Sequence, residues 1–419
     1  MLDAAPFRAV RYDPDVAGDA RATSAPAYDA VEPLAYAGHR EASPYTVLEL
    51  HAPDGAHRRA ASLYRSWRRQ GALVDDVSPA LYRYEIHELV AGVPTAQRGL
   101  LAAVRLGPLD GTAGILPHED VDTARVAARL RRLTELPVEL TPVHALLVGA
   151  PPALTERLAA PPPSAPIVAM TDADGADHRV WALRDPDEQA TLAAALAETR
   201  AVIADGHHRW ARSLAHRDAQ RAAHPDAGSE APFERALVYL ADPADGVRVE
   251  AVHRLLRPLG RRSLAGLEEH FHLERAAVGP AALARWVSAE PAGVMGLLAP
   301  DGTAWLLRPR HRATLVAQLP SARRWAWRDV DAALLEHAIL PSLALPAGAV
   351  HPRADLRRAA AEVSARDDAA LLVVRPVPLP RVLDLAVDGQ RLPPKTTRIA
   401  PKPRAGLLLR SAEAEQAPA

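Results

Sequence analysis

A polar segment of five consecutive residues combines side chains that handle anions and metal ions: Asp205, Gly206, His207, His208 and Arg209. A β-branched run precedes this segment and helix-forming residues follow it, so we expect a strand that turns sharply into a helix, with Gly206 at positive φ. The first turn of that helix would present unpaired N–H groups and the positive end of the helix dipole, which favour phosphate. The two imidazoles and the guanidinium add hydrogen-bond donors around the same point.

Asp205 and the two histidines are the candidate catalytic groups of this segment. Asp205 is suited to hold Mg²⁺, because hard cations prefer carboxylate oxygen, or to accept the proton of a substrate hydroxyl. His207 and His208 are further candidates for contact with a reacting group. The structural alternative is a capped helix start with an aspartate turn and two surface histidines, and the sequence leaves it open.

Two other segments carry residues suited to the same chemistry. His118 and Glu119 stand in a turn before a predicted helix, where they could supply a general base or a metal ligand. Near the C-terminus, Lys395, Thr396 and Lys402 lie in a proline-stiffened loop whose ammonium and hydroxyl groups suit an anionic substrate or a phosphoryl donor.

The two lysines are informative because lysine occurs nowhere else, although the chain has 50 Lys+Arg residues. Such a bias indicates that arginine replaces lysine wherever it can. Lys395 and Lys402 therefore mark sites where a compact ammonium is needed and a guanidinium fork would not fit. Chance survival of two lysines is the alternative.

Arg98 is a further candidate for anion binding. It lies on the second strand of a predicted β-hairpin, formed by residues 81–89 and 97–106. A solvated arginine on the hairpin surface is the alternative interpretation.

The order and spacing of these segments resemble a bacterial and archaeal family known as domain of unknown function 1015. The matching segments are SPYTVLEL, QRGLLAAVRLG, LPHED, IADGHHRWARSL and PPKTTRIAPKPRAGLLL. The DGHHR turn is similar to the phosphate-handling turn of the ParB and sulfiredoxin-like superfamily, which includes free serine kinases. Members of the family also tend to be encoded beside serine-biosynthesis enzymes, which is associational support.

Composition excludes several functional classes. The chain has 419 residues, 48% of them hydrophobic, a formal net charge of −1 and no cysteine. Disulfides, cysteine-ligated zinc and the cysteine chemistry of sulfiredoxin are thereby excluded. The neutral balance argues against a dedicated nucleic-acid surface. No signal segment or membrane-spanning run stands out, so we expect a cytoplasmic protein. P-loop, dinucleotide-binding, zincin and α/β-hydrolase signatures are not found.

The predicted fold is mixed α+β, in two to three lobes with mixed sheets and a ParB/sulfiredoxin-like element around the DGHHR turn. We expect an N-terminal α/β domain over residues 1–150, a DGHHR-bearing domain over 151–262 and a C-terminal α/β lobe over 263–419. Residues 46–50 alternate like a half-buried strand. The proline-rich residues 151–166 suggest a linker or edge loop.

These observations predict a phosphotransferase or phosphate-ester enzyme acting on a small metabolite. The resemblance favours a free L-serine kinase that uses a nucleotide or pyrophosphate donor with Mg²⁺. The alternative is a ParB-like nucleotide-responsive binding or regulatory protein that turns over no small molecule. The expected partners are thus a small substrate and a phosphate donor, with no membrane and no nucleic acid, and the oligomeric state stays open.

The phosphotransferase hypothesis also makes a geometric prediction. Lys395 or Lys402 should lie close enough to His207, His208 or Arg209 to share one phosphate-sized ligand, with His118 and Glu119 lining the same cleft.

Overall fold

The computed structural model describes residues 1–27, 33–52, 55–121, 123–162, 164–244, 246–259, 261–343 and 345–413. Contacts divide the chain into two compact units. Unit 1 comprises Met1–Pro117, Val121–Val247 and Pro401–Ala419, and unit 2 comprises His118–Asp120 and Arg248–Ala400. Within the described ranges, no helix is both long enough and apolar enough to cross a membrane.

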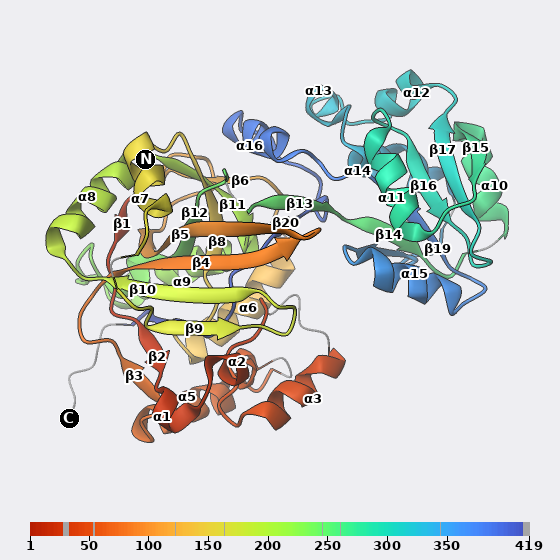
Figure 1. Ribbon diagram of the computed structural model, residues 1–419. Coiled ribbons are helices and arrows are strands. Elements are labelled where there is room, and N and C mark those ends of the chain that lie inside the picture. Colours follow the sequence, from red (N-terminus) through yellow and green to blue (C-terminus); the bar gives the residue numbers. More distant parts are fainter. Residues whose placement is uncertain are drawn as a thin grey trace. The chain divides into compact units, whose positions relative to one another are not determined.

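Unit 1 is built on a mixed sheet whose described part has nine strands. In spatial order these are β6 (Ile115–Pro117), β11 (Arg200–Asp205), β8 (Val143–Val148), β12 (Arg235–Ala241), β5 (Val93–Arg105), β4 (Leu81–Val90), β10 (Asp177–Leu183) and β9 (Val168–Thr171), with β1 (Ala4–Ala5) paired to β5. β11 is parallel to β6 and β12 is parallel to β8, and the other pairs are antiparallel. Figure 1 shows β5, β4, β10 and β9 side by side.

The predicted hairpin of this sheet is confirmed. β4 and β5 are joined at Ala91 and Gly92, which both have positive φ, at 51° and 84°. Positive φ at both central residues is the geometry of a type I′ turn, whose twist matches that of the paired strands.

One face of the sheet packs against helices α7 (Pro152–Ala159) and α8 (Pro186–Ala197) and the start of α9 (His207–Ala223). Alternate residues of the strands β5, β8, β11 and β12 enter this core: on β8 these are Val143, Ala145 and Leu147. Because side chains along a strand point alternately to the two faces, His144 points to the opposite face. The pleat therefore places His144 on the face of β8 that is turned away from this core.

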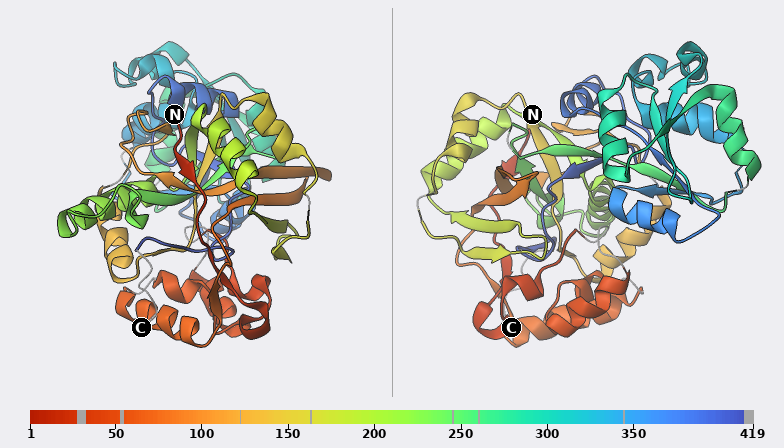
Figure 2. Two further views of the ribbon diagram at one scale, coloured as in Figure 1. Left: turned by 90° about the vertical axis from the view of Figure 1, so that its left-hand side faces the viewer. Right: turned by 45° about the vertical axis from the view of Figure 1, so that its right-hand side comes forward.

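A second core lies under the N-terminal helices, which gather at one end of unit 1 in both views of Figure 2. These helices are α1 (Pro14–Ala17), α2 (Ala20–Thr23), α3 (Pro33–Ala42), α4 (Leu48–His51) and α5 (His57–Arg69). Two short pairs complete the unit, β2 (Val10–Tyr12) with β3 (Leu73–Asp75) and β7 (Val138–Glu139) with β21 (Arg410–Ser411). Helix α6 (Thr123–Glu135) packs against α9.

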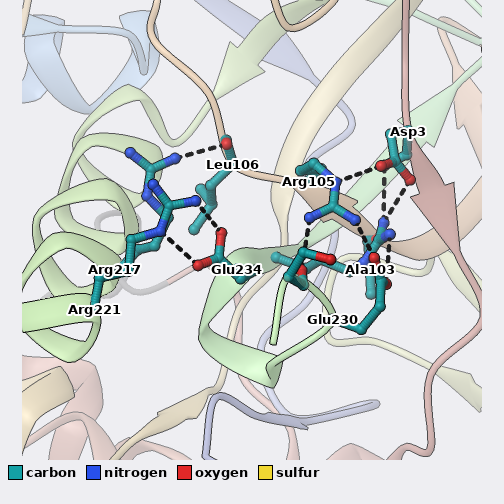
Figure 3. Close-up of polar contacts among 10 residues, drawn as sticks. Asp3, Ala103, Arg105, Leu106, Arg217, Arg221, Glu230 and Glu234 are labelled. Atoms are coloured by element: carbon teal, nitrogen blue, oxygen red, sulfur yellow. Dashed lines mark hydrogen bonds and ion pairs between the residues drawn. The ribbon is translucent and has the colours of Figure 1, made fainter. Parts of the chain in front are cut away.

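Helix α9 is fixed along its length by arginines (Figure 3). Arg217 donates to the Leu106 carbonyl at 2.7 Å, and Arg221 forms two 2.6 Å hydrogen bonds with the buried Glu234 carboxylate. Leu106 follows β5 and Glu234 precedes β12, so these contacts tie the helix to the ends of two central strands. The helix is therefore held in a fixed position relative to the sheet.

Unit 2 contains an antiparallel sheet with six described strands. In spatial order they are β15 (Phe271–Ala276), β17 (Ala304–Pro309), β16 (Met295–Leu298), β19 (Ala370–Val373), β14 (His253–Leu256) and β18 (Val350–Arg353), and β13 (Arg248–Ala251) separately pairs with β20 (Thr397–Ala400). Its helices are α10 (Arg261–His270), α11 (Pro280–Ala289), α12 (Arg312–Ala317), α13 (Arg324–Trp327), α14 (Asp331–Leu334), α15 (Leu356–Ser364) and α16 (Leu379–Val387).

The predicted mixed α+β class with mixed sheets is confirmed. The predicted domain boundaries at 150/151 and 262/263 differ from the boundaries of the two units. Strands β8, β11 and β12 lie in one sheet, and the C-terminal residues from Pro401 belong to unit 1.

Two local predictions are wrong. Residues 46–50 were expected to form a strand but enter helix α4, because Val47, Leu48 and Leu50 all face one core. The expected linker contains helix α7, which starts at Pro152, since proline is well suited to the first position of a helix.

The packing of Trp210, on α9, against the core predicts the effect of replacing this residue. Trp210 is fully buried and its indole N–H donates to the Gly107 carbonyl at 3.0 Å. Trp210→Phe would leave that carbonyl without its partner and should lower the free energy of unfolding by about 1–3 kcal/mol. The same change at the exposed Trp325 is the control and should have little effect in urea unfolding. Equal losses for the two variants would contradict this assignment.

Candidate functional site

The predicted strand, turn and helix are all present at the DGHHR segment. β11 ends at Asp205, Gly206 has φ of 102°, and α9 begins at His207. The backbone N–H of Trp210 donates to the Gly206 carbonyl at 2.9 Å, which closes the first helical turn. A Cβ added at Gly206 would lie 2.7 Å from Nε of Arg209, so the Arg209 side chain folds back over the glycine. Glycine suits this position because it adopts positive φ without strain and leaves space for the Arg209 side chain.

Asp205 is the centre of the site because two cations share its carboxylate. Lys402 Nζ is 2.8 Å from Oδ1, and an Arg209 terminal nitrogen contacts Oδ2. Burial alone would raise the pKa of this carboxyl, but Arg209 and Lys402 outweigh it and hold the pKa well below its ordinary value. Since the folded-state pKa is depressed, the ion pairs contribute their full stabilisation above the ordinary carboxyl pKa, and this contribution decreases as the pH falls through the folded-state value.

Lys402 reaches this site because the C-terminal segment threads through unit 1. The backbone of Ala405 exchanges hydrogen bonds of 2.9 and 3.1 Å with Ala25, and the Gly406 N–H donates to the Leu140 carbonyl at 2.9 Å. The prediction that one of the two lysines shares a ligand-sized space with Arg209 is therefore confirmed for Lys402. Its tip and that of Arg209 contact one carboxylate.

His144 was not predicted and adjoins Asp205. It stands opposite Asp205 in the register of β8 and β11 and stacks on the Tyr239 ring at 5.4 Å. The ring is completely buried, and neither nitrogen has a hydrogen-bond partner within the described ranges. Burial lowers the pKa of His144 to about 3; Asp205 opposes this shift, while Lys402 and Arg209 add to it. The imidazole is therefore neutral at physiological pH.

The two histidines of the turn differ in exposure. His207 is buried at the first position of α9, and His208 is half-buried beside it. Arg98 is half-buried on β5, opposite Glu85 of β4 in the strand register. Catalytic or binding roles for these three residues stay predictions.

His118, Glu119, Lys395 and Thr396, which were also predicted as site residues, belong to unit 2. Glu119 accepts hydrogen bonds from the backbone N–H groups of Lys395 and Thr397, both at 3.3 Å, and from the Thr397 hydroxyl at 3.1 Å. His118 Nε2 lies 2.8 Å from the same hydroxyl, and Thr396 Oγ1 donates to the Pro393 carbonyl at 2.6 Å. The structure thus joins the LPHED and PPKTT segments, which are far apart in sequence.

The arrangement around Asp205 is suited to bind an anion. Arg209, Lys402 and the start of α9 all present positive charge or N–H groups to one point. The same residues are less suited to bind a metal ion. The described ranges hold no group of three or more His, Cys, Asp or Glu side chains able to bind one, and both oxygens of Asp205 contact cations. Mg²⁺ at Asp205 stays a prediction.

Comparison with known proteins gives one family match and several solved structures of limited similarity. The sequence profile described as "Protein of unknown function (DUF1015)" matches residues 4–333. A free serine kinase in complex with AMP aligns over 70% of this chain and 88% of its own, with 15% identity and a TM-score of 0.34. SbnI with a C-terminal truncation from Staphylococcus aureus aligns over 71% and 82%, with 13% identity and a TM-score of 0.34. A conserved hypothetical protein from Pyrococcus furiosus aligns over 68% and 87%, with 14% identity and a TM-score of 0.33. The search of curated proteins gave no match.

The turn geometry predicts the effect of Gly206→Ala. Alanine at positive φ costs about 1–2 kcal/mol, and its Cβ would push the Arg209 guanidinium away from Asp205. We expect a matching loss in the free energy of unfolding, measured in urea, and weaker binding of inorganic phosphate, measured by calorimetry. Gly228→Ala is the control, because Gly228 lacks positive φ and has open space at its Cβ position. If both variants match the parent protein in stability and binding, the turn does not position Arg209.

Proposed function

This chain belongs to the DUF1015 family, and we propose that it transfers a phosphoryl group to the hydroxyl of a small metabolite, with free L-serine as the acceptor. The observation that carries this proposal is the pair of cations, Arg209 and Lys402, on the two oxygens of Asp205 at the start of α9. A phosphate group offers the same pair of charged oxygens at similar spacing. We therefore expect a ligand phosphate to compete with this carboxylate for the two cations.

The chemistry of phosphoryl transfer requires such a site. The acceptor hydroxyl oxygen forms a bond to phosphorus, the bond between phosphorus and the leaving phosphate oxygen breaks, and the hydroxyl proton passes to a base. Arg209 and Lys402 would neutralise the charge on the transferred group, and the N–H groups of α9 would add fixed dipoles. Both cations are held by the fold before the ligand arrives, which reduces the cost of ordering them.

Asp205 fits the role of a positioning residue better than that of a base. Its depressed pKa makes the carboxylate a weak proton acceptor while both ion pairs are in place. His207 and His208, which lie in unit 1 with Asp205, are the proposed groups for proton transfer.

Mg²⁺ is proposed to enter with the phosphate donor. This ion keeps several waters and takes only one or two protein carboxylates together with phosphate oxygens, so a single Asp205 oxygen would suffice as its protein ligand. Bound there, Mg²⁺ would neutralise charge on the donor phosphates.

Product formation tests the function directly. The protein incubated with L-serine, Mg²⁺ and either ATP, ADP or pyrophosphate should yield phosphoserine, detected by ³¹P NMR. Lys402→Met should lower kcat/KM by about 10²–10³-fold, as loss of one charge-stabilising donor does in other enzymes. Lys402→Arg, which keeps the charge but changes the shape, should recover only part of the activity.

Two results would count against this function. Absence of phosphoserine with every donor would refute the acceptor assignment. Nucleotide-dependent dimer closure without any product would favour the ParB-like binding protein instead.

Asp205→Asn tests whether the carboxylate stands where phosphate binds. The change leaves two partly buried cations without their counter-ion and should cost about 3–5 kcal/mol in phosphate-free buffer. Added phosphate should then raise the melting temperature of the variant more than that of the parent, because it replaces the missing charge. Asp218→Asn, at an exposed position of the same helix, is the control. An equal response to phosphate in all three proteins would place the anion elsewhere.

A further inference from the structure

A second buried cation lies one turn along α9 from the Asp205 site. The Arg212 side chain belongs to a residue that is only 5% exposed, and its Nε has no hydrogen-bond partner in the described part of the chain. A buried guanidinium normally has its N–H groups paired, because an unpaired buried donor keeps the full cost of losing water. Arg184, Arg209 and Arg254 also each have one unpaired buried nitrogen, but their guanidiniums make other hydrogen bonds. Arg212 makes none within the described ranges and is therefore a donor available to a ligand.

Other arginines surround Arg212 and increase the local positive charge. α6 packs against α9 and contributes Arg132, which is buried and donates to the Val138 carbonyl through two terminal nitrogens at 3.3 Å. Burial lowers the pKa of Arg212 to about 9; Arg132, Arg209 and Arg129 add to this shift, while Glu139 opposes it. The group of guanidiniums is thus mutually repulsive, and an added anion would relieve that repulsion.

The nearby carboxylate is already engaged by other groups. Glu139 accepts from the Leu237 N–H at 2.7 Å, from Arg410 at 2.9 Å and from the Ser213 hydroxyl at 3.2 Å. These three donors use both carboxylate oxygens. Arg410 is a buried arginine with a full set of partners, because its guanidinium also donates to the carbonyls of Arg235 and Pro232. Arg212 makes no comparable set of contacts within the described ranges.

The position of Arg212 connects it with the first site. Residues three apart on a helix lie on one face with their Cβ atoms about 5–6 Å apart, so Arg209 and Arg212 are neighbours along α9. Adjacent phosphorus atoms of a diphosphate are joined through one oxygen and are closer together than this, within reach of two long side chains. The cations Lys402, Arg209 and Arg212 together are therefore suited to two linked phosphates.

We propose that Arg212, supported by Arg132, binds a second phosphate of the ligand whose first phosphate lies at Arg209 and Lys402. The site is thereby specific for a diphosphate group, which a nucleoside diphosphate and inorganic pyrophosphate have in common. This inference rests on the proposed function for the identity of the first phosphate site.

Calorimetry with the full chain, without serine or Mg²⁺, tests the proposal. Orthophosphate, pyrophosphate and ADP are the three probes. Pyrophosphate should bind the parent protein at least tenfold more tightly than orthophosphate. Arg212→Met should bring this ratio close to one while leaving orthophosphate binding unchanged, because only the second phosphate loses its partner. Arg58→Met removes a charge at a highly exposed position of unit 1 and should preserve the ratio. Should Arg212→Met fail to fold, Arg212→Lys keeps the charge but loses the fork, and the ratio should fall in part.

The outcomes separate this inference from the proposed function. Equal affinity for ADP and pyrophosphate would identify the diphosphate as the recognised group, and tighter ADP binding would show that a nucleoside adds contacts to it. A parent protein that binds pyrophosphate no better than orthophosphate would overturn the proposal, as would an Arg212→Met variant that keeps the parent ratio. Intact diphosphate selectivity without phosphoserine formation would refute the acceptor and leave this site standing.

Discussion

The shared carboxylate of Asp205 is the interaction on which the rest of the site depends. Two cations, Lys402 and Arg209, meet on its two oxygens in a largely buried setting, where charges cost much more to leave unpaired than they do at the surface. That cost constrains three separate parts of the chain at once: the end of β11, the first turn of α9 and the segment after β20. Movement of any one of them would leave a buried charge without its partner.

The fold meets this constraint by fixing each contributor separately. Positive φ at Gly206 turns the chain directly from strand to helix and leaves space for Arg209 to fold back. Backbone hydrogen bonds to Ala25 and Leu140 anchor the segment that carries Lys402. Arginines farther along α9 tie the helix to the ends of β5 and β12. The fold therefore holds the two cations of the site in fixed positions.

The excess of buried arginine in unit 1 has a cost in stability. Arg212 and Arg132 are both buried, and burial lowers the pKa of each, to about 9 and about 10. Repulsion between the guanidiniums destabilises this arrangement, and the proposed anion would relieve that repulsion. Under this proposal, stability and anion affinity would depend on the same side chains.

The sequence by itself determined the chemistry-bearing residues and the local turn. Gly206 between a β-branched run and a helix-forming segment is enough to predict the strand, the turn and the helix, because these depend on neighbours along the chain. The rarity of lysine pointed to Lys402, because this signal depends only on residue type. The sequence predicted that Lys395 or Lys402 would meet this turn, and the tertiary structure decided that Lys402 does so through Asp205. Only the tertiary structure decided the burial of His144 by strand register and the placing of Arg212 beside arginines of α6. Register and helix packing are set by long-range contacts, which no spacing within one segment encodes.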